Sequence, residues 1–234
     1  MKPIRSIGII MDGNRRFAKE RGLPAFEGHR AGYEALKKLT EAAPRLKQTY
    51  GLEFVTLYAF STENWNRTKE EVGYLMSLFE EGLQTVLNEY VKNGNKNPES
   101  AIRIRIIGQR SRFSEKIQTL MSEVEEKTKH FGGITATFAL SYGGRAEILD
   151  AVLKLKKDAP LSEESFTDSL WTAGIPDPDI IIRTGGEQRL SNFLPWQGVY
   201  SELFFPKKYW PEFTPEELEK IFAEYYERER RHGT

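Results

Sequence analysis

Short apolar runs alternate along this chain with longer segments of helical periodicity, and this alternation constrains the fold more than any other feature of the sequence. The runs have the length of buried strands, and most are followed by a segment long enough for a helix. Strands and helices that alternate in this way favour one parallel sheet with helices on both faces. We therefore predict an α/β fold with a mainly parallel six-stranded sheet. The expected strands are 7–11, 54–60, 102–107, 134–140, 179–182 and 199–205.

Apolar residues at three- and four-residue steps predict the helices. They are 28–48, 69–91, 114–129 and 214–231, with shorter helices near 148–153 and 162–171. Segment 69–91 carries the clearest apolar stripe, which ordinarily packs in a core and could instead line a pocket for an apolar ligand. Residues 92–100 are rich in Asn, Gly and Pro and predict a loop. Since no linker or internal repeat divides the 234 residues, we predict a single domain over 1–234.

Charge and composition exclude several classes of protein. Lys plus Arg equals Asp plus Glu at 34 each, which argues against a nucleic-acid-binding protein, because such proteins usually carry a basic excess. The absence of cysteine removes disulfides, thiol nucleophiles and cysteine metal sites, and fits a reducing compartment. The apolar run 7–11 is too short for a signal peptide or a membrane span. We expect a cytoplasmic protein whose contact with a membrane, if it makes one, is peripheral.

Polar clusters follow four of the expected strands. They are 12–16, 61–67, 141–145 and 183–191, and the arginines that suit a phosphate are Arg16, Arg67, Arg183 and Arg189. Because parallel strands place their carboxyl ends at one edge of the sheet, these clusters should meet in one cleft. Guanidinium groups bind phosphate bidentately and keep their charge, so we predict a site for more than one phosphate. Cluster 141–145 is more simply a strand-to-helix turn.

The first cluster begins with Asp12-Gly13-Asn14, which has two interpretations. A carboxylate beside a helix N-terminus suits an anion held together with Mg²⁺, because Mg²⁺ prefers hard oxygen ligands. The same residues are also ordinary turn formers, since Gly accepts positive φ and Asp and Asn bond to nearby backbone groups. These three residues alone do not choose between a site and a plain turn.

Five motifs together resemble the cis-prenyltransferase family, to which undecaprenyl diphosphate synthase belongs, over 7–233. They are Met-Asp-Gly-Asn-x-Arg at 11–16, Gly-His at 28–29, Tyr-Ala-Phe-Ser-x-Glu-Asn-Trp-x-Arg at 58–67, Tyr-Gly-Gly-Arg at 142–145 and Arg-Thr-Gly-Gly-Glu-x-Arg-x-Ser-Asn-Phe at 183–193. The resemblance implies an undecaprenyl diphosphate synthase-like fold with an apolar tunnel. It implies the addition of isopentenyl diphosphate to an allylic diphosphate such as farnesyl diphosphate, with Mg²⁺ as cofactor and a long chain such as undecaprenyl diphosphate as product.

The resemblance also implies roles for individual residues. Asp12 and Asn64 are implied as catalytic residues, with Asp12 at Mg²⁺ and Glu202 as a second metal ligand from a dimer partner or a neighbouring strand end. The implied substrate-binding residues are Gly13, Asn14, Arg15, Arg16, Phe17, His29, Ser61, Glu63, Trp65, Arg67, Arg183, Arg189 and Ser191. The acceptor of the final proton stays open between diphosphate, Asn64 and His29. His29 also has a purely structural interpretation, as do the aromatic rings of Phe17 and Trp65.

Arg231-His232-Gly233 resembles an element that crosses a homodimer into the partner's site, which implies a homodimer with Arg231 and Gly233 at the interface. Arg15 stands where many members have Gly. Ala25 stands where many have a diphosphate-binding arginine, which puts allylic binding in question. Phe17 replaces a common Trp, and segments 44–50 and 93–100 look longer than usual. Ala59 is small, as in members that make medium or long chains.

Two other functions compete with this interpretation. A non-catalytic partner subunit of a prenyltransferase would share the fold, but the intact Asp12, Asn64 and Arg183 argue against it. A metal-dependent phosphohydrolase built on Asp12 would leave 183–191 unexplained. The sequence contains no Walker loop, dinucleotide glycine fingerprint or serine-nucleophile elbow that would favour other chemistry.

Overall fold

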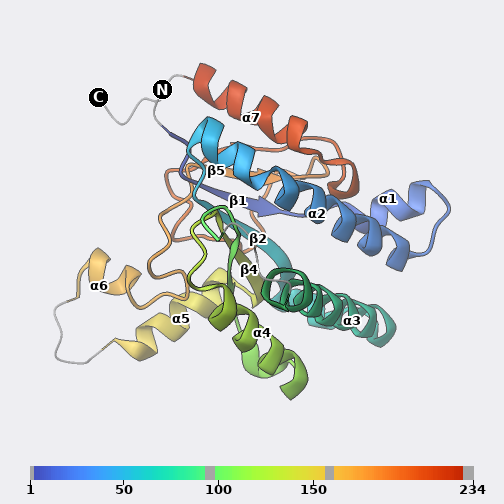
Figure 1. Cartoon of the computed structure of the whole chain (residues 1–234), viewed down its shortest axis with the longest axis horizontal. Coiled ribbons are helices and arrows are strands. Elements are labelled where there is room, and N and C mark those ends of the chain that lie inside the picture. The colour runs from blue at the N-terminus through green and yellow to red at the C-terminus, as the bar shows by residue number, and fades with distance from the viewer. Residues whose placement is uncertain (1–2, 93–97, 156–160, 229–234) are drawn as a thin grey trace.

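The computed structural model describes residues 3–92, 98–155 and 161–228. Its six strands form one sheet in the order β3-β4-β2-β1-β5-β6, and all neighbouring strands are parallel. The strands are β1 (Ser6–Ile10), β2 (Phe54–Ser61), β3 (Arg103–Ile107), β4 (Thr135–Tyr142), β5 (Ile180–Arg183) and β6 (Glu202–Phe204). Figure 1 shows helices packed around this central sheet. The predicted α/β fold with a parallel six-stranded sheet is confirmed.

The helices occupy most of the segments in which the sequence predicts them. They are α1 (Asn14–Glu20), α2 (Ala25–Tyr50), α3 (Lys69–Val86), α4 (Glu115–Thr128), α5 (Gly144–Lys154), α6 (Glu163–Thr167) and α7 (Pro215–Glu227). Short 3-10 helices lie at Thr62–Asn66, Arg110–Arg112 and Trp210–Glu212, and α3 continues as a π-helical turn, Leu87–Lys92. Among the residues described, no helix is long and apolar enough to cross a membrane.

The core lies on both faces of the sheet. Ile9 of β1 faces a core that contains Leu39 of α2 and Phe222 of α7, whereas Ile10 belongs to a core on the opposite face with Phe193. This alternation follows from the two-residue period of a strand. A third cluster joins α3 and α4 to β3 and β4. Because β1 is buried on both faces, residues 7–10 form a continuous apolar run.

Helix α2 begins at Ala25, three residues before the predicted start at Gly28. A Cβ at Gly28 would lie 2.0 Å from the Asn14 carbonyl oxygen, so this glycine lets α2 pack closely on α1. The sequence suggested a helix start at Gly28, but the glycine permits a close helix contact instead. Pro44 lies inside α2, which continues to Tyr50.

Two predicted elements are shorter than expected. Helix α6 ends at Thr167 and is followed by turns, in which the Ser169 and Leu170 N–H groups donate to carbonyls three residues back. Further on, the Thr172 backbone N–H donates to the buried Glu147 carboxylate at 3.1 Å. Strand β6 covers only 202–204, because 198–201 forms a turn closed by a bond from Ser201 N–H to the Gly198 carbonyl. Residues 93–97 of the predicted loop and 229–231 of the predicted last helix lie outside the described residues.

Candidate active site

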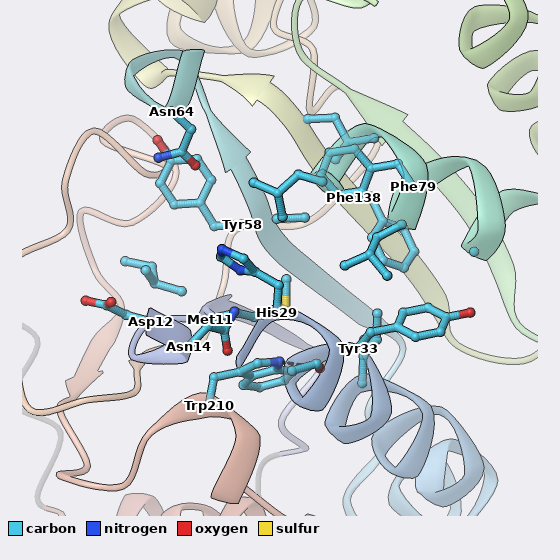
Figure 2. A pocket seen from close by; sticks show the side chains of 18 of the residues that line it. Met11, Asp12, Asn14, His29, Tyr33, Tyr58, Asn64, Phe79, Phe138 and Trp210 are labelled. Carbon is cyan, nitrogen blue, oxygen red and sulfur yellow. Dashed lines mark hydrogen bonds between the residues drawn. The ribbon is translucent and has the colours of Figure 1, made fainter. Parts of the chain in front are cut away.

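The carboxyl ends of β1, β2 and β5 open onto one cavity of about 1620 Å³. Figure 2 shows Asp12, Asn14 and His29 together at one part of its wall, with Phe79 and Phe138 at another. The polar wall contains Asp12, Gly13, Asn14, Arg15, Arg16, His29, Ser61, Glu63, Asn64, Arg67, Arg183 and Ser191. The apolar wall contains Leu75, Leu78, Phe79, Leu83, Val86, Ile104, Ile106, Phe138 and Leu140. The structure therefore brings together most of the predicted site residues and joins them to the apolar face of α3.

Asp12 and Arg183 form an ion pair at the centre of the polar wall. Ile10 lies opposite Arg183 in the register of β1 and β5, so the turn beyond Ile10 brings Asp12 to the end of β5. Asp12 Oδ2 lies 2.8 Å from Arg183 Nη2 and 3.2 Å from Arg16 Nη2. Arg183 is only 5% exposed, and its Nη1 also donates to the Ser191 hydroxyl at 2.6 Å. One buried guanidinium thus orients both the Asp12 carboxylate and Ser191.

Burial and ion pairing act on the pKa of Asp12 in opposite directions. Burial raises the pKa, whereas the hydrogen bond and charge of Arg183 and the charge of Arg16 lower it. The lowering effects prevail, so the pKa of Asp12 lies below its ordinary value. Asp12 is therefore a carboxylate at neutral pH.

The Asp12-Gly13 turn is held by neighbouring segments. Gly13 has a φ of 106°, and a Cβ there would lie 2.5 Å from the Tyr209 ring, so two constraints favour glycine. The Asp12 carbonyl accepts hydrogen bonds from the Thr184 hydroxyl at 2.7 Å and from the Trp210 N–H at 3.0 Å. The turn chemistry and the site geometry predicted for this cluster are thus present together.

His29 and Glu71 form a second polar centre in the cavity. His29 Nε2 lies 3.0 Å from Glu71 Oε1, and the same oxygen accepts a bond from Arg67 Nη1 at 2.8 Å. A carboxylate only accepts, so neutral His29 carries its proton on Nε2 and leaves Nδ1 as an acceptor. Burial lowers the pKa of His29, and the nearby charges of Arg67 and Arg15 lower it further. The Glu71 hydrogen bond and charge raise it without reversing the shift, so the neutral form is favoured.

Sequence reasoning missed Glu71. The residue lies in the first turn of α3, where an acidic side chain is ordinarily explained by the helix dipole. Its spacing of four residues from Arg67 was a signal of an ion pair, but nothing in the sequence indicated that His29 of α2 shares the same carboxylate. Burial raises the pKa of Glu71, while the bond from His29 and the charge of Arg67 hold it below its ordinary value.

The other predicted arginines differ in their access to the cavity. Arg15 is mostly exposed and lines the cavity with its Nε 3.9 Å from Glu71 Oε1. Arg16 lines the cavity and pairs with Glu187 at 3.2 Å. Arg189 also pairs with Glu187 and is not part of the cavity wall. The ion pair uses only Nη1 of an exposed guanidinium, so the other N–H donors of Arg189 stay available to a phosphate.

Two predicted aromatic residues also lie outside the cavity wall. Phe17 packs under the Arg21 guanidinium, which lies 3.9 Å from the ring centroid. Trp65 packs against Phe60 and Phe113, and its indole N–H donates to the Ser141 hydroxyl at 2.9 Å. For both aromatic residues, the observed contacts are those of structural packing.

Asn64 lies in the 3-10 helix that follows β2. Its Oδ1 accepts the Ser61 backbone N–H at 3.1 Å, which fixes the amide at the cavity wall. Glu63 accepts a weak bond from Asn192 at 3.4 Å, and burial raises its pKa while its hydrogen bonds hold it below the ordinary value.

Glu202 lies away from Asp12 within this chain. It pairs with Ile180 at the amino end of β5, three residues before Arg183, and its carboxylate binds Arg228 at 2.9 Å. Three strand residues span about 10 Å. This register therefore separates Glu202 from the Asp12 carboxylate within one chain. Arg231 and Gly233 lie outside the described residues.

Asp12 has the chemistry of a magnesium ligand. It supplies hard carboxylate oxygens at the cavity wall, and Mg²⁺ is commonly held by one or two carboxylates together with substrate phosphates. In the described part of the chain, no three His, Cys, Asp or Glu side chains gather into a metal site. Asp12 thus fits a metal that is shared with a diphosphate.

The fold is that of an α/β protein with a parallel sheet. Arginines and a carboxylate at its strand ends lie beside a large apolar cavity, an arrangement that suits a ligand with an anionic head and an apolar chain. The sequence profile described as "Putative undecaprenyl diphosphate synthase" matches residues 10–233. The chain therefore belongs to the undecaprenyl diphosphate synthase family of isoprenyl transferases, as its motifs predicted.

Individual relatives match over almost their whole length. The isoprenyl transferase of Thermotoga maritima is 44% identical over 239 residues, which cover 100% of this chain and 98% of that protein. The isoprenyl transferase of Treponema denticola is 44% identical over 232 residues, which cover 98% of this chain and 97% of that protein. Lavandulyl diphosphate synthase from Lavandula x intermedia, solved with dimethylallyl diphosphate, superposes with a TM-score of 0.87 at 33% identity over 98% of both chains. The structure of a probable undecaprenyl diphosphate synthase from Campylobacter jejuni superposes with a TM-score of 0.80 at 33% identity over 100% of both chains.

Proposed function

We propose that this chain is a cis-prenyltransferase that adds isopentenyl diphosphate units to an allylic diphosphate. Farnesyl diphosphate is the expected starter, and a long-chain polyprenyl diphosphate such as undecaprenyl diphosphate is the expected product. The observation that supports this proposal is the single cavity with a cationic wall and an apolar wall. Its volume exceeds the roughly 300–1,000 Å³ of most small-ligand pockets, which suits a ligand with a long chain. The solved relative that holds dimethylallyl diphosphate supports an allylic substrate.

The two diphosphates would occupy different parts of the polar wall. We assign Asn14, Arg16 and His29 to the allylic diphosphate, and Arg183 with Ser191 to isopentenyl diphosphate. In the reaction the allylic C–O bond breaks, a C–C bond forms with the isopentenyl double bond, and a proton leaves. Negative charge develops on the departing diphosphate, and guanidinium groups that are already in place stabilise it.

Asp12 would hold Mg²⁺ together with diphosphate oxygens, with Glu202 of a dimer partner as the expected second ligand. When bound, Mg²⁺ stabilises the charge that develops on the leaving group. The apolar wall excludes water from the reactive allylic carbon, and Asn64 and Arg67 border the space in which the two substrates meet. The neutral state of His29 keeps Nδ1 available as one of the candidate proton acceptors, beside Asn64 and diphosphate.

The test is incubation of the purified protein with farnesyl diphosphate, labelled isopentenyl diphosphate and Mg²⁺, followed by chain-length analysis. We expect a ladder that ends in one dominant long product and that disappears with Asp12→Ala or with a chelator. Release of inorganic phosphate without chain growth would favour the phosphohydrolase. No incorporation from any allylic starter would favour a non-catalytic partner subunit.

We further propose that the chain forms a homodimer. Leu149, Val152 and Leu153 are exposed apolar residues on one side of α5, and Leu153 is 84% exposed. Tyr200, beside the edge strand β6, is 82% exposed. Apolar residues that gather at an open surface often mark a protein interface. Sedimentation should give a dimer for the wild type and a monomer for Leu153→Asp, whereas a wild-type monomer would contradict the proposal.

A further inference from the structure

The turn 141–145 carries one of the sequence motifs, yet none of its residues lines the cavity. It connects the end of β4 to the start of α5, and Ser141 is fully buried with a φ of 49°. A serine in the left-handed region is strained, and such residues persist where surrounding contacts hold them. Besides hydrogen bonds to Gln109 and Glu147, this turn contacts two cavity-lining segments that are far apart in sequence.

The first contact of the turn is with loop 62–67, which carries Asn64 and Arg67. The Ser141 hydroxyl accepts the Trp65 indole N–H at 2.9 Å. The Arg112 guanidinium lies 4.8 Å from the Trp65 ring centroid, so the indole is also held by stacking. Trp65 therefore fastens the loop to the turn rather than to a ligand.

The second contact is with segment 189–194, which carries Ser191. The Gly144 N–H donates to the Asn192 carbonyl at 2.8 Å, and the Arg145 N–H donates to Asn192 Oδ1 at 2.9 Å. Ser191 and Asn192 have φ values of 48° and 66°, so this segment also needs external support to keep its conformation. The two hydrogen bonds to Asn192 supply such support beside the Arg183–Ser191 contact.

Gly143 lies between the two segments. A Cβ at Gly143 would lie 2.8 Å from the Thr62 hydroxyl oxygen and 2.7 Å from Asn192 Nδ2, one atom from each segment. Its φ of −158° is ordinary extended backbone, so space and not conformation favours glycine here.

We propose that the turn 141–145 is a positioning element that fastens loop 62–67 and segment 189–194 at a fixed distance, and so aligns Asn64 and Arg67 with Ser191. Its residues are positioning residues that act through Trp65 and Asn192. The kinetic part of this inference rests on the proposed function, which places Asn64 and Arg67 beside the space where the two substrates meet and assigns Ser191 to isopentenyl diphosphate.

Steady-state kinetics with both substrates test the two connections separately. Ser141→Ala removes the acceptor of the Trp65 N–H, and we expect kcat to fall about tenfold with the KM for isopentenyl diphosphate little changed. Ser141→Gly adopts the left-handed conformation without strain but also lacks the acceptor, so it should show the same fall in kcat. The Cβ of Gly143→Ala would clash with Thr62 and Asn192, one residue of each segment. This variant should therefore both lower kcat and raise the KM for isopentenyl diphosphate. Ser122→Ala, an exposed helical serine, is the matched control.

Trp65→Phe removes the same hydrogen bond from the other side. The double variant with Ser141→Ala should then be no slower than Trp65→Phe alone, because Trp65→Phe already removes the hydrogen bond that Ser141→Ala removes. Additive losses would overturn the proposal, as would wild-type kcat in Ser141→Ala or in Ser141→Gly.

Amide hydrogen exchange supplies a test that does not depend on turnover. Ser141→Ala should raise the exchange rate of residues 62–67, and Gly143→Ala should raise it in 62–67 and 189–194, with no change in Ser122→Ala. Unchanged exchange in both variants would overturn the positioning role. A wild-type protein without prenyltransferase activity would instead contradict the proposed function, and the exchange result would still decide this inference.

Discussion

Glu71 Oε1 lies 3.0 Å from His29 Nε2 and 2.8 Å from Arg67 Nη1, so one carboxylate oxygen joins α2, α3 and the loop before α3. In the absence of substrate, the Glu71 carboxylate neutralises part of the positive charge at the cavity wall. A diphosphate that enters this wall competes with Glu71 for Arg67. The carboxylate therefore influences both the charge state of His29 and the availability of Arg67.

Glu71→Gln should lower the pKa of His29 further, because the hydrogen bond and charge of Glu71 raise that pKa. The substitution also removes the ion pair that orients Arg67 and the carboxylate that fixes the His29 tautomer. We expect this loss of positioning to outweigh the release of Arg67, so that kcat/KM for the allylic diphosphate falls about tenfold. NMR titration of the His29 ring measures the pKa. Glu70→Gln, which changes the neighbouring exposed residue, is the control. A higher His29 pKa in Glu71→Gln would contradict the assigned role.

The pH dependence of stability should report the burial of His29. Burial holds its folded pKa below the ordinary 6.5. At pH values between the lowered pKa and 6.5, the unfolded chain binds more protons than the folded chain. The free energy of unfolding therefore rises with pH through this window, and His29 causes no further rise above pH 6.5. Urea denaturation between about pH 5 and pH 7 should show this rise in the wild type. His29→Gln should flatten this rise in the free energy of unfolding, whereas His130→Gln, which changes an exposed histidine, should not. An equal pH dependence in the wild type and both variants would exclude His29 as the source of the rise.

Asp12→Asn should destabilise the fold as well as abolish turnover. Arg183 is buried, and the loss of its charged partner should cost about 1–3 kcal/mol at neutral pH. Because the folded pKa of Asp12 is lowered, its contribution is complete above the ordinary pKa of 3.8 and is lost as the pH falls through the folded value. Chemical denaturation at pH 7 measures the cost, with the exposed Asp168→Asn as control. Equal stability of Asp12→Asn and the wild type would show that Arg183 is satisfied without this carboxylate.

The sequence was informative where a local pattern decides the structure. Each predicted strand forms. The apolar runs of the central strands are buried on both faces of the parallel sheet, whereas the edge strand β3 alternates arginine and isoleucine. The convergence of Asp12 and Arg183 also followed from strand order, since polar residues after parallel strands meet at one edge.

The sequence was uninformative where a contact depends on packing between distant segments. Val199 and Tyr200 have strand propensity, but they lie in an exposed turn whose surroundings no local pattern encodes. Trp65 belongs to the same motif as Asn64, and only the positions of Ser141 and Phe113 show that its indole lies outside the cavity. The missed Glu71–His29 contact has the same origin, because it joins residues 42 positions apart.

Ala59→Leu should shorten the product. Ala59 lies at a β-bulge, where the register of β2 against β4 shifts between Tyr58 and Phe60, and its side chain lines the cavity beside the apolar wall. A leucine there fills space that a growing chain would occupy, while the polar wall that binds both diphosphates is unchanged. We therefore expect the dominant product to lose one or more five-carbon units with only a modest change in the rate of the first condensation. Mass spectrometry of the products measures this shift, and Ala223→Leu on the exposed side of α7 is the control. An unchanged distribution of chain lengths would show that the growing chain takes a path that does not pass Ala59.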